Sequence, residues 1–342
     1  MKTDLAGVKS ILVIKLRGVG DVLLSTIVTP NLRNAFPHAK IDYLTEPASV
    51  PVFTGNQFID DVVVFDRKSM SGLDLIRLVR SKRYSMVIDL FGNPRTALVT
   101  RLSGAGIRVG YRFRGRSYAY NRIVEPRGGI VHNTQFNLDA LESLGIAIID
   151  RNLYFPVNSD DEMFINRFLE KEEIGDRNLV AINTSGGWST KRWGLDRFAE
   201  LADRIQSRHK VPIVIVWGPG EREEAEALSS RMTHRATLAP ATTLKQLGAL
   251  FQRCAFLVSN DSGPLHIAAA MGTPVVGIYG PTNPKLQGPY GAGHVVVRNE
   301  TVPCLGCNLT ACPINHPCMK ELSVDMVESA VERLLSINRM SL

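Results

Sequence analysis

Short apolar runs alternate with amphipathic stretches in the first half of the chain. Residues 11–14 (Ile-Leu-Val-Ile) form a continuous apolar run, which is typical of a parallel strand covered on both faces. Gly18 and Gly20 follow, and a helical pattern then runs over residues 22–36 and ends before Pro37. The other predicted elements here are strands at 40–44, 61–65 and 86–90 and a helix at 73–80. This alternation predicts an open, mostly parallel sheet.

A second series of the same kind begins near residue 160. Its clearest element is an amphipathic helix over residues 195–208, with Leu195, Phe198, Leu201, Ala202 and Ile205 on one face. The other predicted elements are helices at 161–171, 221–232 and 264–271 and strands at 179–183, 212–217, 255–258 and 275–279. Together the two series predict an α/β fold of two Rossmann-like domains that face a cleft.

The pattern also sets the expected domain boundaries. The segment 153–159 holds Pro156 and is the expected linker, which gives domains at 1–155 and 156–320. Residues 322–337 carry an apolar stripe and predict a helix within the last segment, 321–342. The sequence leaves open whether this helix packs back on the first domain.

Length and composition agree with two globular domains. The chain has 342 residues, with 44% hydrophobic and 21% charged residues, which excludes a disordered or fibrous protein. Its formal net charge of +7 makes anionic partners plausible, among them phosphates, acidic sugars, nucleic acid and anionic lipids. No apolar stretch approaches the ~20 residues of a membrane helix. We therefore expect a cytoplasmic protein.

The first loop with candidate chemistry joins the strand at 11–14 to the following helix. Glycines here let the backbone approach a ligand, and a helix N-terminus attracts anions. Asp21 could take a proton from a substrate hydroxyl, or it could only cap a helix that starts at Val22. A dinucleotide-binding Gly-x-Gly-x-x-Gly is disfavoured because Leu23 occupies the last position. This argues against a nicotinamide dehydrogenase.

Two further loops hold anion-binding side chains. The first, residues 183–193, carries hydroxyls, glycines and two adjacent cations, so Thr184, Ser185 and Lys191 could bind a diphosphate. The alternative for this loop is a solvated turn. In the second, residues 259–266 (Ser-Asn-Asp-Ser-Gly-Pro-Leu-His), the proline suits a first helical position, so the helix dipole would point at a ligand. Asp261 and His266 could instead be a cap and a core histidine.

Taken together, these loops resemble the family 9 glycosyltransferases, the heptosyltransferases of lipopolysaccharide core assembly. The resemblance spans residues 9–319 and is most specific in Asn-Asp-Ser-Gly-Pro-Leu-His at 260–266, in Ala-Ala-Ala-Met-Gly-Thr-Pro-Val-Val at 268–276 and in Tyr-Gly-Pro-Thr at 279–282. It also includes Gly-Val-Gly-Asp at 18–21, Lys-Arg-Trp at 191–193 and Gly-Pro-Gly-Glu at 218–221. It implies a GT-B architecture, with the acceptor on the first domain and the nucleotide sugar on the second.

The resemblance also implies roles for individual residues. Asp21 matches the catalytic base, with Gly18 and Gly20 on the acceptor side, and Lys191 matches the residue that meets the donor phosphates. Glu221 falls where the family has a carboxylate for the nucleotide ribose, with Glu223 as an alternative alignment. The other implied donor-binding residues are Thr184, Ser185, Asp261, Ser262, Gly263 and His266.

The implied reaction moves heptose from ADP-heptose to the inner core of lipopolysaccharide, with inversion at the anomeric centre. No metal is required for this chemistry. The alternative is a family member that uses another nucleotide sugar or another acceptor, because the sequence alone fixes neither pocket.

A basic segment bears on the acceptor. Residues 90–124 hold seven arginines and no acidic residue, and aromatic side chains lie between them. Such a pattern suits a solvated face or RNA binding. Given the family resemblance, we expect Arg112, Arg114 and Arg116 to bind acidic groups of a lipid acceptor at the inner face of the cytoplasmic membrane, with no nucleic acid partner.

Four of the five cysteines lie close together. Cys304, Cys307, Cys312 and Cys318 have spacings that suit a structural zinc site or an iron–sulfur cluster in a reducing compartment. Free thiols are the alternative, and disulfides are disfavoured there. An interaction protein that binds metal or RNA through these cysteines and the arginines would leave the loop at 259–266 unexplained.

Overall fold

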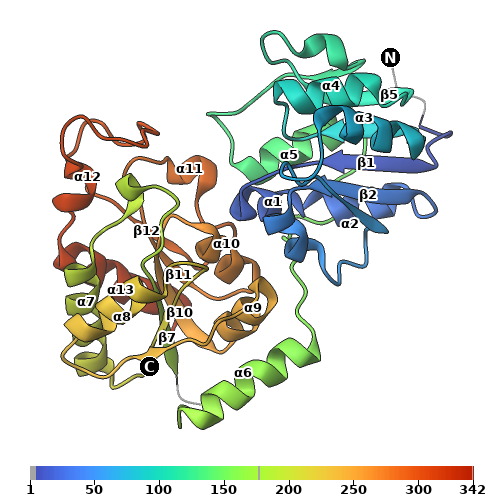
Figure 1. The fold of residues 1–342 in the computed structure, drawn as a ribbon. Helices are drawn as coiled ribbons and strands as arrows, with labels where there is room; N and C mark the ends of the chain where they lie inside the picture. Colours follow the sequence, from blue (N-terminus) through green and yellow to red (C-terminus); the bar gives the residue numbers. More distant parts are fainter. Residues whose placement is uncertain (1–4, 176–177, 341) are drawn as a thin grey trace. The chain divides into compact units, whose positions relative to one another are not determined.

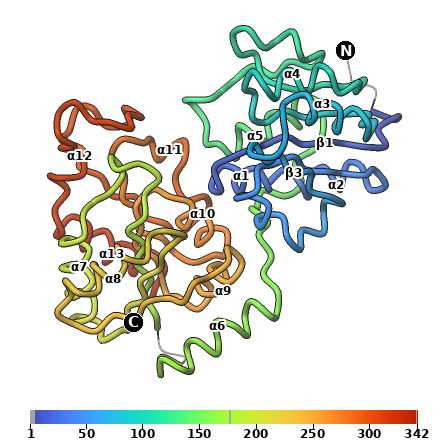
Figure 2. Tube along the Cα trace, in the orientation of Figure 1, coloured from blue at the N-terminus to red at the C-terminus, as the bar shows by residue number. Residues whose placement is uncertain are grey.

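The computed structural model describes residues 5–175, 178–340 and 342, and the chain divides into two compact units, Met1–Pro156 and Val157–Leu342 (Figure 1). Between them, residues 143–158 run without a helix or strand from one unit to the next (Figure 2). None of the described helices is long and apolar enough to cross a membrane.

The first unit is built on a six-stranded parallel sheet with the order β3-β2-β1-β4-β5-β6. Its strands are β1 (Ser10–Ile14), β2 (Lys40–Thr45), β3 (Asp61–Val64), β4 (Met86–Asp89), β5 (Ile107–Tyr111) and β6 (Arg122–Val124). Its helices are α1 (Val19–Ser25), α2 (Val28–Ala35), α3 (Gly72–Ser81), α4 (Pro94–Leu102) and α5 (Asn133–Glu142), with short 3-10 turns η1 (Pro47–Phe53) and η2 (Ser117–Ala119). Strand β1 is apolar and buried because helices cover both faces of the sheet.

The second unit has a sheet of the same kind, with the order β12-β11-β10-β7-β8-β9. Its strands are β7 (Leu179–Asn183), β8 (Ile213–Val216), β9 (Thr237–Leu238), β10 (Cys254–Asn260), β11 (Val275–Ile278) and β12 (Val295–Val297). Its helices are α6 (Ser159–Lys171), α7 (Leu195–His209), α8 (Arg222–Arg231), α9 (Leu244–Gln252), α10 (Gly263–Ala270), α11 (Pro284–Gln287), α12 (Pro317–Lys320) and α13 (Val324–Asn338), with the 3-10 turn η3 (Ser189–Lys191).

Counted along the chain, the two sheets have the same strand order. The first and fourth strands of each unit, β1 with β4 and β7 with β10, pair in the middle of its sheet. At such a switch point the loops after the two strands diverge, and ligands bind outside their carboxyl ends. The predicted α/β class with GT-B architecture is confirmed.

Two expectations about helices differ from the structure. The pattern over residues 22–36 is two helices, α1 and α2, separated at Thr26 and Ile27. The C-terminal helix α13 buries its stripe (Val327, Ala330, Val331, Leu334 and Leu335) in the core of the second unit and packs on α7 and β12. Arg204 on α7 holds Asp325 (2.7 Å) and Glu328 (2.8 Å) of α13. The prediction left packing on the first domain open, whereas these contacts all lie within the second unit.

Candidate active site

The second unit gathers polar side chains where β7 and β10 end. Asn183, the last residue of β7, donates through Nδ2 to Ser259 Oγ (2.8 Å) and to Ser262 Oγ (2.9 Å). Ser185 Oγ donates to Asn183 Oδ1 (2.6 Å). Asn183, Ser185 and Ser259 are buried, and a buried polar network of this kind fixes the loops that carry it.

A buried ion pair lies beside this network. Lys191 Nζ is 2.7 Å from Asp261 Oδ2, and the side chains are 14% and 5% exposed. Thr282 Oγ1 donates to the same carboxylate oxygen (2.6 Å), and the lysine ammonium sits 4.5 Å from the centre of the Trp188 ring. Lys191 is thus held by Asp261 and by Trp188 of its own loop, and Thr282 in turn holds Asp261.

Asn260 joins these loops to the body of the unit. Its Nδ2 donates to the Thr184 carbonyl (2.7 Å), and its Oδ1 accepts from the Trp193 N–H (3.3 Å). The Trp193 ring is buried and donates to the Leu322 carbonyl (2.8 Å). The sequence places Asn260 in the motif but assigns it no role, and its function here is to position its neighbours.

Helix α10 begins beside the ion pair. Ser262 is its N-cap residue, Gly263 its first residue, and Pro264 lies in its first turn. The backbone N–H groups of this turn have no partners within the helix, so they suit an anion. His266 lies in the same helix and is 6% exposed.

Glu221 is engaged in a turn at the end of β8. It is the N-cap residue of α8, and its Oε2 accepts from the Gly218 N–H (3.0 Å). Arg192 Nη2 is 3.9 Å from Glu221 Oε1, and Arg192 Nε donates to the Gly186 carbonyl (3.4 Å). Arg192 therefore links the Glu221 turn to the loop that carries Lys191. Glu223 lies in the first turn of α8.

In the first unit, Asp21 lies in the first turn of α1. The helix begins at Val19, with Gly18 as its N-cap residue, so the expectation that Asp21 caps a helix starting at Val22 is wrong. Gly18 has φ +82°, and a Cβ built there would lie 2.9 Å from Asp21 Oδ2. Asn133 Nδ2, from the first turn of α5, lies 3.4 Å from Asp21 Oδ1. Asn133 is 112 positions away in the sequence and was not predicted.

Two buried ionisable residues, Lys15 and Asp89, lie near Asp21. Lys15 Nζ donates to the Leu90 carbonyl (3.2 Å), and burial lowers the pKa of Lys15 although the negative charges of Asp21 and Asp89 oppose this. Burial raises the pKa of Asp89, whose carboxylate accepts from the Gly92 N–H (2.8 Å) and from Tyr120 Oη (2.8 Å). Both residues stand at the ends of β1 and β4, where the switch point of this sheet lies.

The family model of glycosyltransferase family 9 (heptosyltransferase) matches residues 73–316. The chain belongs to this family. It is a glycosyltransferase.

Curated and solved relatives of this family 9 glycosyltransferase span most of its length. Lipopolysaccharide heptosyltransferase 3 of Escherichia coli is 28% identical over 77% of this chain and 81% of that protein. The structure of the glycosyl transferase family 9 from Veillonella parvula covers 96% of this chain and 97% of its own, with a TM-score of 0.84 and 27% identity. The E. coli heptosyltransferase WaaC with ADP has a TM-score of 0.73 at 21% identity, covering 95% of this chain and 99% of its own, which supports the fold alone.

The arginines predicted to bind the acceptor of this glycosyltransferase differ in their surroundings. Arg112 Nε is 2.5 Å from Glu125 Oε1, and both side chains are largely exposed. Arg116 donates to the Gly92 carbonyl (2.6 Å) and lies over the Phe113 ring, so it fixes a loop. Arg114 is exposed. The structure thus gives Arg116 a structural contact and leaves Arg114 at the surface.

The cysteine segment packs on the loop that carries Lys191. The four thiols are free, and Cys318 is buried while Cys307 is exposed. Gly306 N–H donates to the Gly280 carbonyl (3.1 Å), and Thr190 Oγ1 donates to the Leu309 carbonyl (2.9 Å), next to Lys191. Within residues 5–175, 178–340 and 342, no three His, Cys, Asp or Glu side chains are grouped to hold a metal ion. Zinc stays a prediction.

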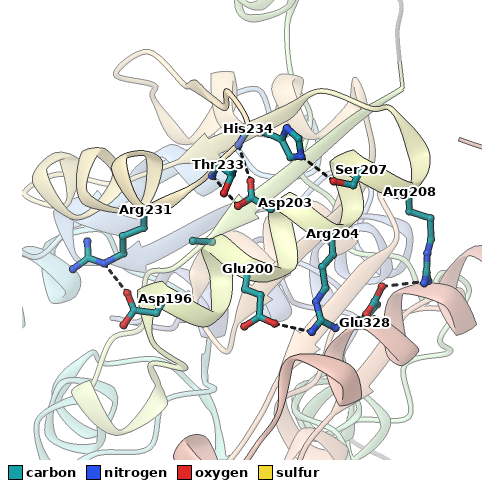
Figure 3. A pocket seen from close by; sticks show the side chains of 11 residues that line it. Asp196, Glu200, Asp203, Arg204, Ser207, Arg208, Arg231, Thr233, His234 and Glu328 are labelled. Atoms are coloured by element: carbon teal, nitrogen blue, oxygen red, sulfur yellow. Dashed lines mark hydrogen bonds and ion pairs between the residues drawn. The ribbon is translucent and has the colours of Figure 1, made fainter.

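A surface hollow of about 990 Å³ on α7 is built differently from the candidate site (Figure 3). Its charged side chains pair with one another: Arg231 with Asp196 (2.9 Å), Arg208 with Glu328 (3.2 Å), and Asp203 with the N–H groups of Thr233 and His234. These contacts join α7 to α13, to the end of α8 and to the segment that follows α8. We interpret the hollow as part of the scaffold.

Proposed function

We propose that the protein transfers heptose from ADP-heptose to the core region of lipopolysaccharide, with inversion at the anomeric carbon. The observation that carries the proposal is the Lys191–Asp261 pair beside the first turn of α10, because it offers a cation and the backbone N–H groups of a helix N-terminus to a diphosphate. Relatives named lipopolysaccharide heptosyltransferase, at 24–28% identity over most of the chain, support the sugar and the acceptor.

In the proposed reaction, an acceptor hydroxyl attacks the anomeric carbon of heptose and the carbon–oxygen bond to the diphosphate breaks. Asp21 takes the hydroxyl proton, and the diphosphate leaves as ADP with its growing negative charge near Lys191. The transition state has oxocarbenium character, as in glycoside hydrolysis. Asn133 supports the role of Asp21, since a hydrogen bond to one carboxylate oxygen leaves the other for the hydroxyl.

The donor would be held by residues of the second unit. We propose that Lys191 and the first turn of α10 bind the diphosphate, with hydroxyls of Thr184, Ser185 and Ser262 nearby, and that Glu221 binds the ribose. Glu221 Oε2 accepts from the Gly218 N–H, and Oε1, 3.9 Å from Arg192 Nη2, would accept from a ribose hydroxyl. Asp261 would then position Lys191, with His266 supporting the loop.

The experiment that tests this proposal is to incubate the protein with ADP-heptose and a panel of truncated core acceptors and to weigh the products. A product heavier by one heptosyl unit, with inverted anomeric configuration by NMR, is the expected result. Transfer only from another nucleotide sugar would identify a different donor. A product with retained configuration would contradict the proposed single displacement.

Asp21→Asn tests the base. Asparagine is similar in size but does not accept the proton, so turnover should fall by about 10²–10⁴-fold while the fold is kept. Asp74→Asn is the matched control, because Asp74 also lies in the first turn of a helix of the first unit. Near-normal turnover of Asp21→Asn would remove this residue from the mechanism.

We propose that the transfer step needs no metal and that the four cysteines, which in the described part of the chain are not grouped to hold a metal, come together around a structural zinc when it binds. Turnover should therefore persist when EDTA is present in the assay, because proton transfer and charge stabilisation come from side chains. Metal analysis of protein purified without a tag should give about one zinc per chain, as a Cys₄ set would bind. Loss of turnover with EDTA, restored by magnesium, would contradict the first statement, and metal-free active protein would contradict the second.

A further inference from the structure

The cysteine segment, residues 304–318, is anchored in the core of the second unit at both ends. At its start, Cys304 and Leu305 pack against the hydrophobic core of this unit. At its end, Cys318 and the following Met319 are buried in the same core. The described chain between these anchors forms an irregular loop that leads into α12 (Figure 1). Contacts made by the middle of this loop are therefore contacts with an element that is fixed at its two ends.

One side of the cysteine segment is bonded to the loop that carries Lys191. Thr190 directly precedes Lys191, and its Oγ1 donates to the Leu309 carbonyl (2.9 Å). Thr190 is 2% exposed, so its hydroxyl depends on this protein partner rather than on water. The Leu309 carbonyl therefore fixes the backbone from which the lysine side chain extends.

The other side of the cysteine segment is bonded to the loop between β11 and α11. Asn308 N–H donates to the Pro281 carbonyl (2.7 Å). Pro281 precedes Thr282, which is buried and donates through Oγ1 to Asp261 Oδ2 (2.6 Å). Two neighbouring residues of the cysteine segment thus reach both the loop that carries the lysine of the ion pair and the loop that supports its aspartate.

The loop between β11 and α11 also packs closely on the end of the cysteine segment. A Cβ built at Gly280 would lie 2.6 Å from Met319 Sδ and 2.9 Å from Cys318 Sγ. Only glycine allows this close approach. The loop therefore meets the segment at two points, and a displacement of the segment would be transmitted to it.

We propose that the cysteine segment positions Lys191 for the diphosphate of the donor, and that Thr190 is the positioning residue through which it acts. The inference rests on the proposed function, in which Lys191 meets that diphosphate. A lysine side chain that is already ordered binds phosphate without the entropy cost of ordering a mobile one. The alternative is that the segment only covers these loops and stabilises the fold. The two cases differ in what they predict for the binding of ADP.

The test compares Thr190→Val with Thr273→Val by isothermal titration calorimetry with ADP. Thr273 is a matched residue, because it is also buried and its Oγ1 donates to the Phe251 carbonyl (2.7 Å). It precedes β11, whereas the ion pair is supported by the loop that follows this strand. Each variant loses one buried hydrogen bond, so each Tm should fall by about 2–4 °C.

Only the variant at position 190 should change the affinity for ADP. Thr190→Val should raise the Kd for ADP by about ten-fold, because the Lys191 side chain must then be ordered on binding. Thr273→Val should leave this Kd unchanged. Thr190→Ser keeps the hydroxyl and should restore the wild-type Kd.

A double-mutant cycle separates the positioning of Lys191 from a general effect on the site. In the Lys191→Met background, Thr190→Val should change the Kd for ADP by less than about two-fold, because no ammonium is left to position. Adenosine has no phosphate and should bind Thr190→Val as tightly as it binds the wild-type protein.

Three outcomes would overturn the inference. They are an unchanged Kd for ADP in Thr190→Val, an equal rise in Thr273→Val, and a full ten-fold effect of Thr190→Val in the Lys191→Met background. If the wild-type protein does not bind ADP, or if Lys191→Met binds it as tightly as wild type, the proposed function on which the inference rests would fail instead.

Discussion

The two units hold their candidate functional residues in different ways. In the second unit, Lys191, Asp261, Asn183 and Ser185 are all buried or nearly so; Lys191 pairs with Asp261, and Asn183 is hydrogen-bonded to Ser185 and Ser259. In the first unit, Asp21 is half-buried with a 3.4 Å contact to Asn133, and Arg112 and Arg114 are exposed. The same sheet topology thus carries a site of buried, hydrogen-bonded residues in the second unit and a more exposed site, which we call the open site, in the first unit.

This difference indicates what each unit has to recognise. A nucleotide diphosphate is a small ligand of constant shape, and prearranged donors and cations bind it without a cost for ordering side chains. A large, acidic acceptor is bound by many weak contacts at a surface, for which long arginine side chains are suited. Under the proposed function, the second unit would hold the donor in a prearranged site and the first unit would hold the acceptor on an adaptable surface.

Among tests of this comparison, the substitution Lys191→Met has the largest expected effect. Methionine keeps much of the length of the side chain but removes the charge that would meet the leaving diphosphate, so kcat/KM should fall by about 10²–10³-fold. Steady-state kinetics with varied donor would measure it. Arg192→Met is the neighbouring control and should cost less, because Arg192 links Glu221 and Gly186 rather than Asp261. Equal losses in both variants would contradict a special role for Lys191.

Lys245 provides a pH-dependent test that acts on the second unit alone. It lies on α9, and burial lowers its pKa from 10.5 to about 8, while Asp161 on α6 partly opposes this. Below pH 8 the lysine is charged in the folded and unfolded states alike, and the fold carries the full cost of burying that charge. Between about pH 8 and 10.5 the folded protein loses the proton first, so its stability should rise with pH.

Lys245→Met should remove this dependence. The variant should be more stable than wild type at pH 7 by up to about 3 kcal/mol, and the gain should vanish as pH approaches 10.5. Denaturant unfolding at several pH values would measure it, with the unfolding of the first unit as the internal control. A gain that does not change with pH would show that packing, and not the charge, is responsible.

Gly18→Ala and Gly104→Ala form a matched pair for the open site. The two glycines have φ of +82° and +83°, so alanine should cost about 1 kcal/mol or more of stability at each position. Only at Gly18 does the added Cβ meet Asp21 Oδ2, at 2.9 Å, whereas Gly104 has open space. Turnover should therefore fall by on the order of 10²-fold for Gly18→Ala and stay near wild type for Gly104→Ala. Equal turnover of the two variants would show that Asp21 tolerates displacement.

Much of the sheet core and of the second site could be predicted from the sequence because the signals are local. Strands β1, β7 and β10 are continuous apolar runs, and Asp261, Ser262 and Gly263 directly follow β10. The pairing of Lys191 with Asp261 could not be predicted, since 70 residues separate them and only the strand order brings their loops together. Asn133 could not be predicted for the same reason, because its partner Asp21 is 112 positions away in the sequence.

Helices were harder to predict where a helix is interrupted by local hydrogen bonds, or where the apolar and polar faces of a helix differ little in sequence. Pro30 in the first turn of α2 has no N–H to donate to the Thr26 carbonyl, which instead accepts from the N–H and Oγ1 of Thr29, and this separates α1 from α2. Helix α4 was not predicted because its outward face carries Leu98 and Leu102, so apolar residues occur all around it.

The shared strand order has a consequence for how such enzymes diversify. Each unit has its own hydrophobic core and carries its functional loops at its own switch point, and a single connecting segment joins the two. Substitutions that change the ligand specificity of one unit need not alter the functional residues of the other unit. Under the proposed function, a lineage could change its acceptor while keeping its nucleotide sugar, and chimeras joined near Pro156 should inherit the two specificities separately.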